Sequence, residues 1–479
     1  MRLVKLITPK KIKTLHCKSL TILVLFFTAF NPVFSQDNSP YSRYGIGDIV
    51  PNTNILSRGM GGVSAAYSDI LSINFSNPAS YASFQSLVEP RSKKIVSGRA
   101  ILDVGMNFES RTLQESSPLK KFTASNALFS YLNVGVPLKP NLGMSFGLRP
   151  VSRVSYKIIR NETLINPIAP FDTIENAITR YEGDGGSYLA SIGLGYALFS
   201  KKKAYGLEEK LSVGLNGGYL FGKKDYSTKR SLLNDTVLYY QGNFQNRTTY
   251  GNLWFNAGVQ YQVPLDTASR ITLAIGAFGN WGQKMNASQD ILRETFAFDN
   301  NLGDIRLDSV SDMRDVKGKI IMPSSFTFGF ILQKPFILEK NRREAGWMLG
   351  VDFSMQNWSK YRFYGQSDSL INKWELRVGG QYTPFPKRNY FSNVTYRAGF
   401  FVGPDYIKVG NKLPQIGGSF GLGLPLAVNR QAPNQFTIIN MAFEYGRRGN
   451  SSNLLRESLF RFSLGLSFSD IWFGKRKYD

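Results

Sequence analysis

The sequence predicts an all-β fold: a transmembrane antiparallel β-barrel of about fourteen strands with an N-terminal plug segment in its lumen. Large apolar side chains alternate with small or polar ones over many segments, as at Phe460, Phe462, Leu464, Leu466 and Phe468. Aromatic residues make up 14% of the chain, although the mean hydropathy is only −0.20. No apolar run after residue 35 approaches the ~20 residues that a membrane-spanning helix needs.

The alternating segments are too long for an ordinary soluble sheet. Many run for more than ten residues, whereas strands of soluble proteins usually have about 5–6. Tryptophans lie near segment ends on the apolar face, as the aromatic girdles of a barrel require. We expect fourteen strands at roughly 95–109, 122–137, 141–158, 187–199, 210–230, 237–263, 270–284, 319–333, 346–361, 373–383, 393–403, 415–426, 435–446 and 457–470. The residues between them, including 285–318, are expected to be loops and turns.

The chain divides into four predicted parts. Residues 1–35 have a basic start, an apolar run and a small residue, Ser35, at the end, which indicates a cleaved signal peptide. Residues 36–94 form the N-terminal segment and plug, residues 95–470 the transmembrane barrel, and residues 471–479 a periplasmic tail. Because long loops lie outside and short turns in the periplasm, both termini are expected in the periplasm of a Gram-negative cell, beneath its outer membrane.

Loss of the signal peptide also restricts the chemistry. The one histidine, His16, and the one cysteine, Cys17, are removed with it. The mature chain therefore has no Ser-His-Asp or Cys-His catalysis, no histidine metal site and no disulfide. We assign no catalytic, cofactor-binding or metal-binding residue, and we expect that the protein is not an enzyme. The net charge of +24 falls to +18 but stays basic, and export argues against nucleic acid as the partner.

The stretch from residue 57 to residue 84 carries the predicted plug. It is rich in glycine and alanine and lightly charged, so it is compact enough to sit in the lumen of a large barrel. A linker with one short helix is the alternative. The plug residues that we single out are Arg58, Gly59, Gly61, Gly62, Asn77 and Pro78.

The pattern of Arg58, Gly59, Gly61, Gly62 and Ala66, followed by Asn77-Pro78-Ala79, resembles the N-terminal hatch of the FadL family of outer-membrane channels. The preceding stretch from Tyr41 to Asp48 resembles the mature start of related barrels in Bacteroidota. The FadL resemblance implies fourteen strands, a hatch in the lumen and passive transport of hydrophobic small molecules. In that family a kink in the third strand makes a side opening. Pro150 lies in our third strand, and because proline cannot donate to a strand ladder, we expect the strand to be interrupted there.

Polar residues on the inward face of the predicted strands have two readings. They either form a packed lumen that fixes the plug or line a selective passage. The residues concerned are Asp352, Glu375, Arg377, Glu444 and Arg461. Glu444 and Arg461 flank one loop almost symmetrically, so the alternation predicts that they are cross-strand neighbours.

Two functions stay open from the sequence. The first is a passive channel for hydrophobic small molecules, as the FadL resemblance implies. The second is a non-catalytic barrel subunit of a larger outer-membrane complex for protein assembly or secretion. The expected partners are outer-membrane lipid with either a hydrophobic ligand or other envelope proteins, and no nucleic acid or cofactor. Charged side chains in the lumen weigh against the first function, because a hydrophobic ligand makes no favourable interaction with them.

Overall fold

The computed structural model describes residues 39–472, except 89–94, 117–118, 169–172, 234–239, 300–302, 340–341 and 427–433. The expected signal peptide and residues 473–479 of the expected tail lie outside this range.

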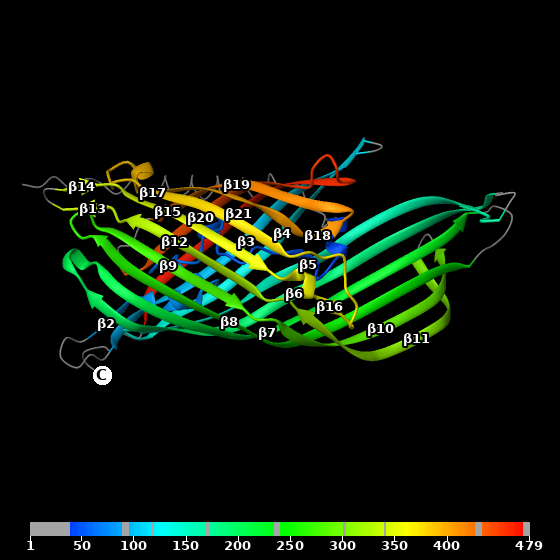
Figure 1. Cartoon of the computed structure of the whole chain (residues 1–479), viewed down its shortest axis with the longest axis horizontal. Helices are drawn as coiled ribbons and strands as arrows, with labels where there is room; N and C mark the ends of the chain where they lie inside the picture. Colours follow the sequence, from blue (N-terminus) through cyan, green and yellow to red (C-terminus); the bar gives the residue numbers. More distant parts are fainter. Residues whose placement is uncertain are drawn as a thin grey trace, which may run out of the picture.

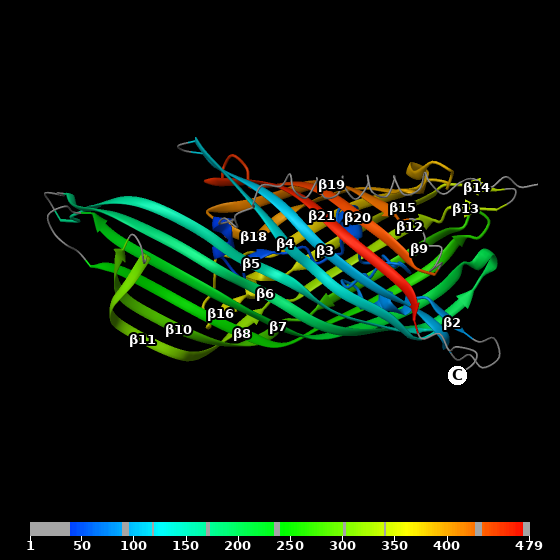
Figure 2. The same ribbon diagram turned by 180° about the vertical axis from the view of Figure 1, so that it is seen from behind.

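Fourteen strands pair in sequence order and close into one antiparallel ring, because the last strand pairs with the first (Figures 1 and 2). The predicted fourteen-stranded barrel is therefore confirmed. The ring consists of β3 (Ile95–Ser116), β4 (Leu119–Lys139), β5 (Leu142–Ile165), β6 (Thr173–Lys202), β7 (Glu208–Leu233), β8 (Gln241–Asp266), β9 (Ile271–Asn280), β12 (Ser325–Lys334), β15 (Gly346–Gln356), β17 (Lys373–Thr383), β18 (Thr395–Val409), β19 (Asn411–Pro425), β20 (Phe436–Arg448) and β21 (Leu455–Trp472).

The wall is apolar outside and polar inside, the reverse of a soluble protein. On β21, Phe460 and Leu466 are 47% and 42% exposed, whereas Ser463 and Ser467 are buried. Successive side chains of a strand point to opposite faces of the sheet, so this alternation separates two surfaces. An exposed apolar band around a closed ring suits a surface that faces lipid.

A six-stranded sheet extends beyond the ring at the end away from Ile95 and Trp472. It contains the far halves of β5, β6, β7 and β8, together with β10 (Gln283–Asp299) and β11 (Gly303–Met322) (Figure 1). β10 pairs with β8 beyond the end of β9, and β11 pairs with β10. The strands β5 to β8 have 24 to 30 residues, whereas β9 and β12 have 10. Crossing a membrane takes about 9–11 residues, so this sheet exceeds what the membrane requires.

The hairpin of β10 and β11 corrects the expectation that residues 285–318 form a loop. Both faces of this hairpin carry charged residues, so it lacks the period-two apolar pattern on which the prediction rested. Its register also shifts at three places between Gln289 and Phe296, which interrupts any regular alternation. The strand expected at 319–333 is likewise two strands, because Pro323 separates the end of β11 from β12.

The N-terminal segment contacts strands on opposite sides of the ring. Its elements are η2 (Pro40–Arg43), β1 (Asp48–Ile49), α2 (Ile55–Arg58), η3 (Pro78–Ser83) and β2 (Ser86–Val88). Its contacts include Tyr81 with Gly143 of β5, Ala65 with Gly276 of β9, Met60 with Gly379 of β17 and Ile55 with Gly465 of β21. A segment that touches opposite walls is enclosed by them. Among the described residues, no helix is long and apolar enough to cross a membrane.

The remaining elements are short and lie between the barrel strands. They are η4 (Ala204–Gly206), β13 (Ile337–Leu338), β14 (Arg343–Glu344), η5 (Trp358–Lys360), β16 (Arg362–Phe363) and η6 (Tyr390–Asn393).

The third strand of the ring, β5, is irregular at Pro150. Its register with β6 shifts between Pro150 and Ser152, and its pairing with β4 ends at Leu148. Proline has no N–H for the ladder, so a bulge is the expected response. The predicted interruption is therefore present. Whether it serves as a side passage stays a proposal.

A closed ring predicts resistance to detergent. Every strand has two neighbours, so unfolding must break a whole ladder at once. We expect unboiled protein in dodecyl sulfate to migrate differently from boiled protein and to retain a β-type circular dichroism spectrum. Co-migration of the two samples, or a helical spectrum, would contradict the closed barrel.

Candidate functional site

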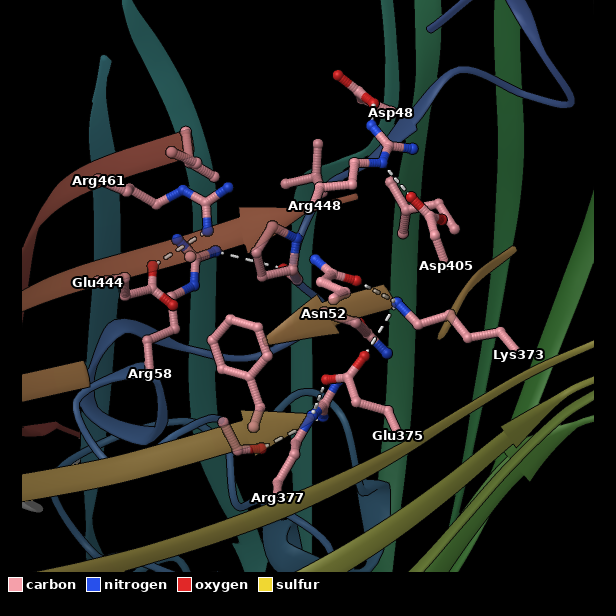
Figure 3. Close-up of a pocket in the computed structure, with 18 of the residues that line it drawn as sticks. Asp48, Asn52, Arg58, Lys373, Glu375, Arg377, Asp405, Glu444, Arg448 and Arg461 are labelled. Carbon is pink, nitrogen blue, oxygen red and sulfur yellow. Dashed lines mark hydrogen bonds and ion pairs between the residues drawn. The ribbon is translucent and has the colours of Figure 1, made fainter. Parts of the chain in front are cut away.

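A cavity of about 190 Å³ lies in the lumen between the N-terminal segment and the barrel wall (Figure 3). Its lining is dominated by charged side chains from β1, α2 and five barrel strands. The principal ones are Asp48, Arg58, Arg111, Lys373, Glu375, Arg377, Asp405, Glu444, Arg448, Glu457 and Arg461. The lumen therefore presents a network of ion pairs at this point.

Asp48 of the N-terminal segment is held by two arginines of the wall. Arg111 Nη1 lies 2.8 Å from its Oδ2 and Arg448 Nη1 lies 2.9 Å from its Oδ1. Glu457 Oε2 bridges the same two arginines at 3.0 and 3.2 Å. Burial by itself would raise the pKa of Asp48, but the two guanidinium groups outweigh it and lower that pKa below its usual value. Asp48 therefore stays ionised at neutral pH.

Backbone pairing brings Asp48 to this position. Asp48 and Ile49 form the short strand β1, which pairs antiparallel with Arg153 and Ser152 of β5. Arg448 also forms an ion pair with Asp405 of β18. Arg448 of β20 thus links β1, β18 and β21. It therefore fixes the N-terminal segment to the wall beside the cavity.

A second ion network confirms the predicted neighbours Glu444 and Arg461. The two residues face each other across β20 and β21, and Arg461 Nη1 lies 3.1 Å from Glu444 Oε2. Arg461 Nε is also 2.7 Å from Oε1 of Glu109 on β3, which the sequence analysis did not single out. Arg461 is 8% exposed and Glu109 is 7% exposed. The guanidinium group therefore links three successive strands of the wall.

A third network contains the predicted residues Glu375 and Arg377. Glu375 accepts from Lys373 Nζ at 2.9 Å and from Arg377 Nε at 2.6 Å, all on β17. Arg377 Nη1 also donates to the carbonyl oxygen of Gly62 at 3.4 Å. This contact joins the wall to the glycine-rich stretch of the N-terminal segment.

Asp352 lies outside the cavity and binds the N-terminal segment directly. Its Oδ2 accepts from the backbone N–H groups of Ser64 and Ala65 at 2.7 and 2.8 Å. The residue is fully buried. A buried carboxylate needs such donors, because burying an unpaired charge is costly. Asp352 and Arg377, predicted on facing strands, are indeed cross-strand partners in the register.

Arg58 is the most deeply enclosed cation of the N-terminal segment. It is 1% exposed and ends helix α2, which begins after the capping residue Asn54. Its Nη1 donates to Asn107 Oδ1 at 2.6 Å and its Nη2 to Ser130 Oγ at 2.9 Å. Burial lowers the pKa of Arg58 to about 10, with Glu444 acting against this effect. Arg58 thus connects α2 with β3 and β4.

Glycines after Arg58 allow the backbone to approach the wall. Gly61 and Gly62 have φ values of 68° and 88°, which side chains rarely tolerate. A β-carbon on Gly61 would also lie 2.8 Å from the Phe400 nitrogen of β18. Gly59 faces Gly421 of β19 at similarly short range. The Arg-Gly-x-Gly-Gly pattern is therefore explained by close packing of backbone on backbone.

Asn77 and Pro78 begin the 3₁₀-helix η3 and fix the far end of the segment. Asn77 Oδ1 accepts from Ala79 N at 3.1 Å, and its Nδ2 donates to Ala65 O at 2.6 Å. The Pro78 carbonyl packs on Gly195 and Gly214 of β6 and β7, where a β-carbon would not fit. Both predicted residues thus act in local structure and in contact with the wall.

The sequence analysis missed the Asp48 network. Asp48, Arg111, Asp405, Arg448 and Glu457 meet only because β1 pairs with β5 and the ring closes. Alternation places Arg111 and Glu457 on the inward face of their strands, but nothing in the sequence shows which residue of the N-terminal segment they meet. Among the described residues, no group of three or more acidic side chains is arranged to hold a metal ion.

The fold and the charged lumen define an outer-membrane β-barrel with an enclosed N-terminal segment. The family model BamG matches residues 16–479, so the chain belongs to the BamG family. No curated protein sequence matches the chain.

Three solved structures with a similar arrangement share little sequence with this chain. One is the CymD monoaromatic hydrocarbon channel, at 12% identity and a TM-score of 0.48, over 89% of this chain and 98% of that one. A Pseudomonas aeruginosa FadL homologue has 13% identity and a TM-score of 0.46, over 89% and 100%. The Pseudomonas putida toluene transporter TodX has 15% identity and a TM-score of 0.43, over 89% and 99%.

Removing the Arg448 side chain should loosen the N-terminal segment. Arg448→Ala leaves Asp48, Asp405 and Glu457 without one of their cations, and breaking a buried pair costs about 3–5 kcal/mol. We expect a lower temperature for the heat-induced gel shift and faster proteolysis near Asp48.

The neighbouring Arg447 provides the matched control. It lies on the opposite face of β20 and is exposed, so Arg447→Ala should change stability by no more than about 0.5 kcal/mol. Equal losses in the two variants would show that the Arg448 network does not hold the segment.

Proposed function

We propose that this protein is a non-catalytic barrel subunit of a larger outer-membrane complex for protein assembly or secretion. In this proposal the N-terminal segment is a permanent plug, and the wall and its extension carry the contacts with partner proteins. The end of the barrel that bears Ile95 and Trp472 faces the periplasm.

The observation that carries the proposal is the way in which the wall holds the segment between residues 39 and 88. Backbone carbonyls pack on wall glycines, and Asp48 and Arg58 are bonded to wall side chains. The cavity beside Asp48 and Arg58 is about 190 Å³ and lined mainly by charged residues. A second cavity, of about 120 Å³, lies beside Ile49 and Trp254. An apolar solute passing through the first cavity would have to strip water from ionised groups without replacing their hydrogen bonds, which is unfavourable.

Two further features support a role in a complex. The extension formed by β5–β8, β10 and β11 stands beyond the part that crosses the membrane and offers a large rigid surface. Exposed lysines at the opposite end, Lys201 and Lys202 among them, offer a basic surface to an acidic partner. Membership of the BamG family is compatible with an assembly role.

Co-purification tests this proposal. We expect a tagged chain, extracted from membranes with a mild detergent, to bring down the same envelope proteins in a fixed ratio across repeated preparations. A tagged, unrelated outer-membrane barrel at the same level is the control for trapping in shared micelles. A chain that elutes alone, with the mass of one barrel, would refute the proposal.

A passive channel for hydrophobic small molecules is the second candidate. It is favoured by the interruption of β5 at Pro150 and by an apolar hollow of about 370 Å³ on the membrane face beside it. The hollow is lined by Leu132, Phe146, Leu148 and Ile192 around small residues of β6 and β7.

Replacement of Pro150 separates this candidate from the first. Pro150→Val restores an N–H to the strand, so a side passage that depends on the bulge should narrow. If the channel operates, uptake of a hydrophobic fluorescent probe into liposomes should slow while heat modifiability is unchanged. A variant lacking residues 57–84 serves as the open control, and equal uptake by wild type and Pro150→Val would rule out this passage.

A further inference from the structure

The barrel sheet splits between β4 and β5 on the side of the extension. β4 is paired with β3 from Leu119 to Gly135, but its pairing with β5 begins only at Leu132, opposite Leu148. Beyond that point the two strands diverge, as both views of the fold show (Figures 1 and 2). Two strand edges thus face a gap.

The β5 edge of the gap is covered in part by the chain itself, from Val151 to Ser155. Asp48 and Ile49 pair with β5 as a short added strand. Ser39 N donates to Ser155 O at 3.1 Å, and Val50 N donates to Val151 O at 3.0 Å. A segment that is not part of the ring therefore already adds to this sheet.

The β4 edge has no such cover. Between Leu119 and Ser130, no backbone hydrogen bond joins β4 to any described segment other than β3. Every second residue of an edge strand directs its N–H and C=O outward, so about six residues offer unpaired groups. Leu119, Phe122 and Phe129 on this stretch are 66%, 50% and 39% exposed.

A second free edge belongs to β11, and its residues disfavour the addition of another strand. β11 pairs with β16 only at Ile320 and Ile321, and Tyr364 N also donates to Lys319 O, so no strand pairs with its edge from Gly303 to Gly318. Charged residues crowd this edge and bulges interrupt its hairpin, which are the devices that prevent strand addition. Residues 122–130 of β4 contain no charge and no proline.

Buried polar atoms at the gap also lack partners. Arg153 Nη2 of β5 reaches across to Asn126 Oδ1 of β4 at 3.4 Å. The other nitrogens of these groups, Arg153 Nη1 and Asn126 Nδ2, are buried without a hydrogen-bond partner, and Asn126 is 4% exposed. A polar group of a bound chain that reached this point would satisfy these donors, and leaving buried donors without a partner is costly.

We propose that the free edge of β4, residues 119–130, binds an extended strand of another envelope protein, which continues the barrel sheet into the gap. The proposal rests on the proposed role as a complex subunit and names the surface that this role uses. The partner strand is uncharged where it lies beside residues 122–130 and acidic at the end that meets the exposed Lys120 and Lys121.

A second copy of the chain does not fit this edge. Two copies in one membrane would be related by a twofold axis normal to it, so their β4 strands would run parallel with identical groups opposite each other. Donors would then face donors, whereas a strand ladder needs donors opposite acceptors.

The closing experiment uses the full chain in its native membrane. A photo-crosslinking amino acid is placed at Ala127, which is exposed on β4, and separately at Val310, which is exposed on the charged edge of β11. We expect a crosslink from Ala127 to a protein that also co-purifies in fixed ratio, and none to that protein from Val310. A crosslink from Ala127 to a second copy of the chain would overturn the proposal.

Charge on the edge provides the second arm. The double substitution Ser125→Lys and Ala127→Lys places charges on the β4 edge, as on β11, and should disfavour the addition of a partner strand. Val310→Lys is the control. We expect recovery of the partner to fall at least about tenfold, equivalent to roughly 1.4 kcal/mol, only for the β4 variant. Heat modifiability verifies that each barrel is folded.

The outcomes separate this inference from the proposed function. Fixed-ratio partners that persist in the β4 variant, with no crosslink from Ala127, overturn the docking site and leave the subunit role standing. Equal loss of the partner in the Val310→Lys control overturns the site as well. A wild-type chain without partners overturns the subunit role and the docking site together.

Discussion

The structure depends on closure of the strand ring. In a membrane no water is available to pair with a free backbone N–H or C=O, so each strand must have a neighbour on both sides. The pairing of β21 with β3, from Leu455 to Trp472, supplies the last ladder and removes the edges. Once the ring is closed, alternation along each strand forces one apolar surface outward and one polar surface inward.

The inward surface creates a second requirement, since polar and charged groups in a confined lumen must find partners. The N-terminal segment meets it in two ways. Wall glycines such as Gly379 let its backbone come within contact distance, and ion networks around Arg448 and Arg461 neutralise the charges that remain. Burying single charges would cost more than these networks, which explains why cations and anions alternate around the cavity.

Closure does not extend along the whole length of the strands. β4 and β5 pair only from Leu132 to Lys139 and then diverge, and the sheet from β5 to β11 continues beyond the ring with free edges. The three resulting edges differ: β5 is covered by residues 39–50 from Val151 to Ser155, β11 is charged, and β4 has neither cover nor charge from residue 122 to residue 130. This difference points to β4 as the edge kept for another chain.

The sequence by itself determined the class of fold, the number of ring strands and the inward face. Period-two alternation is local, so it can be read at Phe460 to Phe468 without knowing any neighbour. It also placed Glu444 opposite Arg461, because a short loop sets the register of adjacent strands. The break at Pro150 followed from the missing N–H alone.

Only the tertiary structure decided what depends on distant contacts. The Asp48 network joins residues 48, 111, 405, 448 and 457, which meet because β1 adds to β5 inside a closed ring. The hairpin of β10 and β11 escaped prediction because both of its faces are charged and no apolar core imposes a period on it. The sequence likewise does not show the free edge of β4, because whether a strand is paired depends on where its neighbouring strands lie in the tertiary structure.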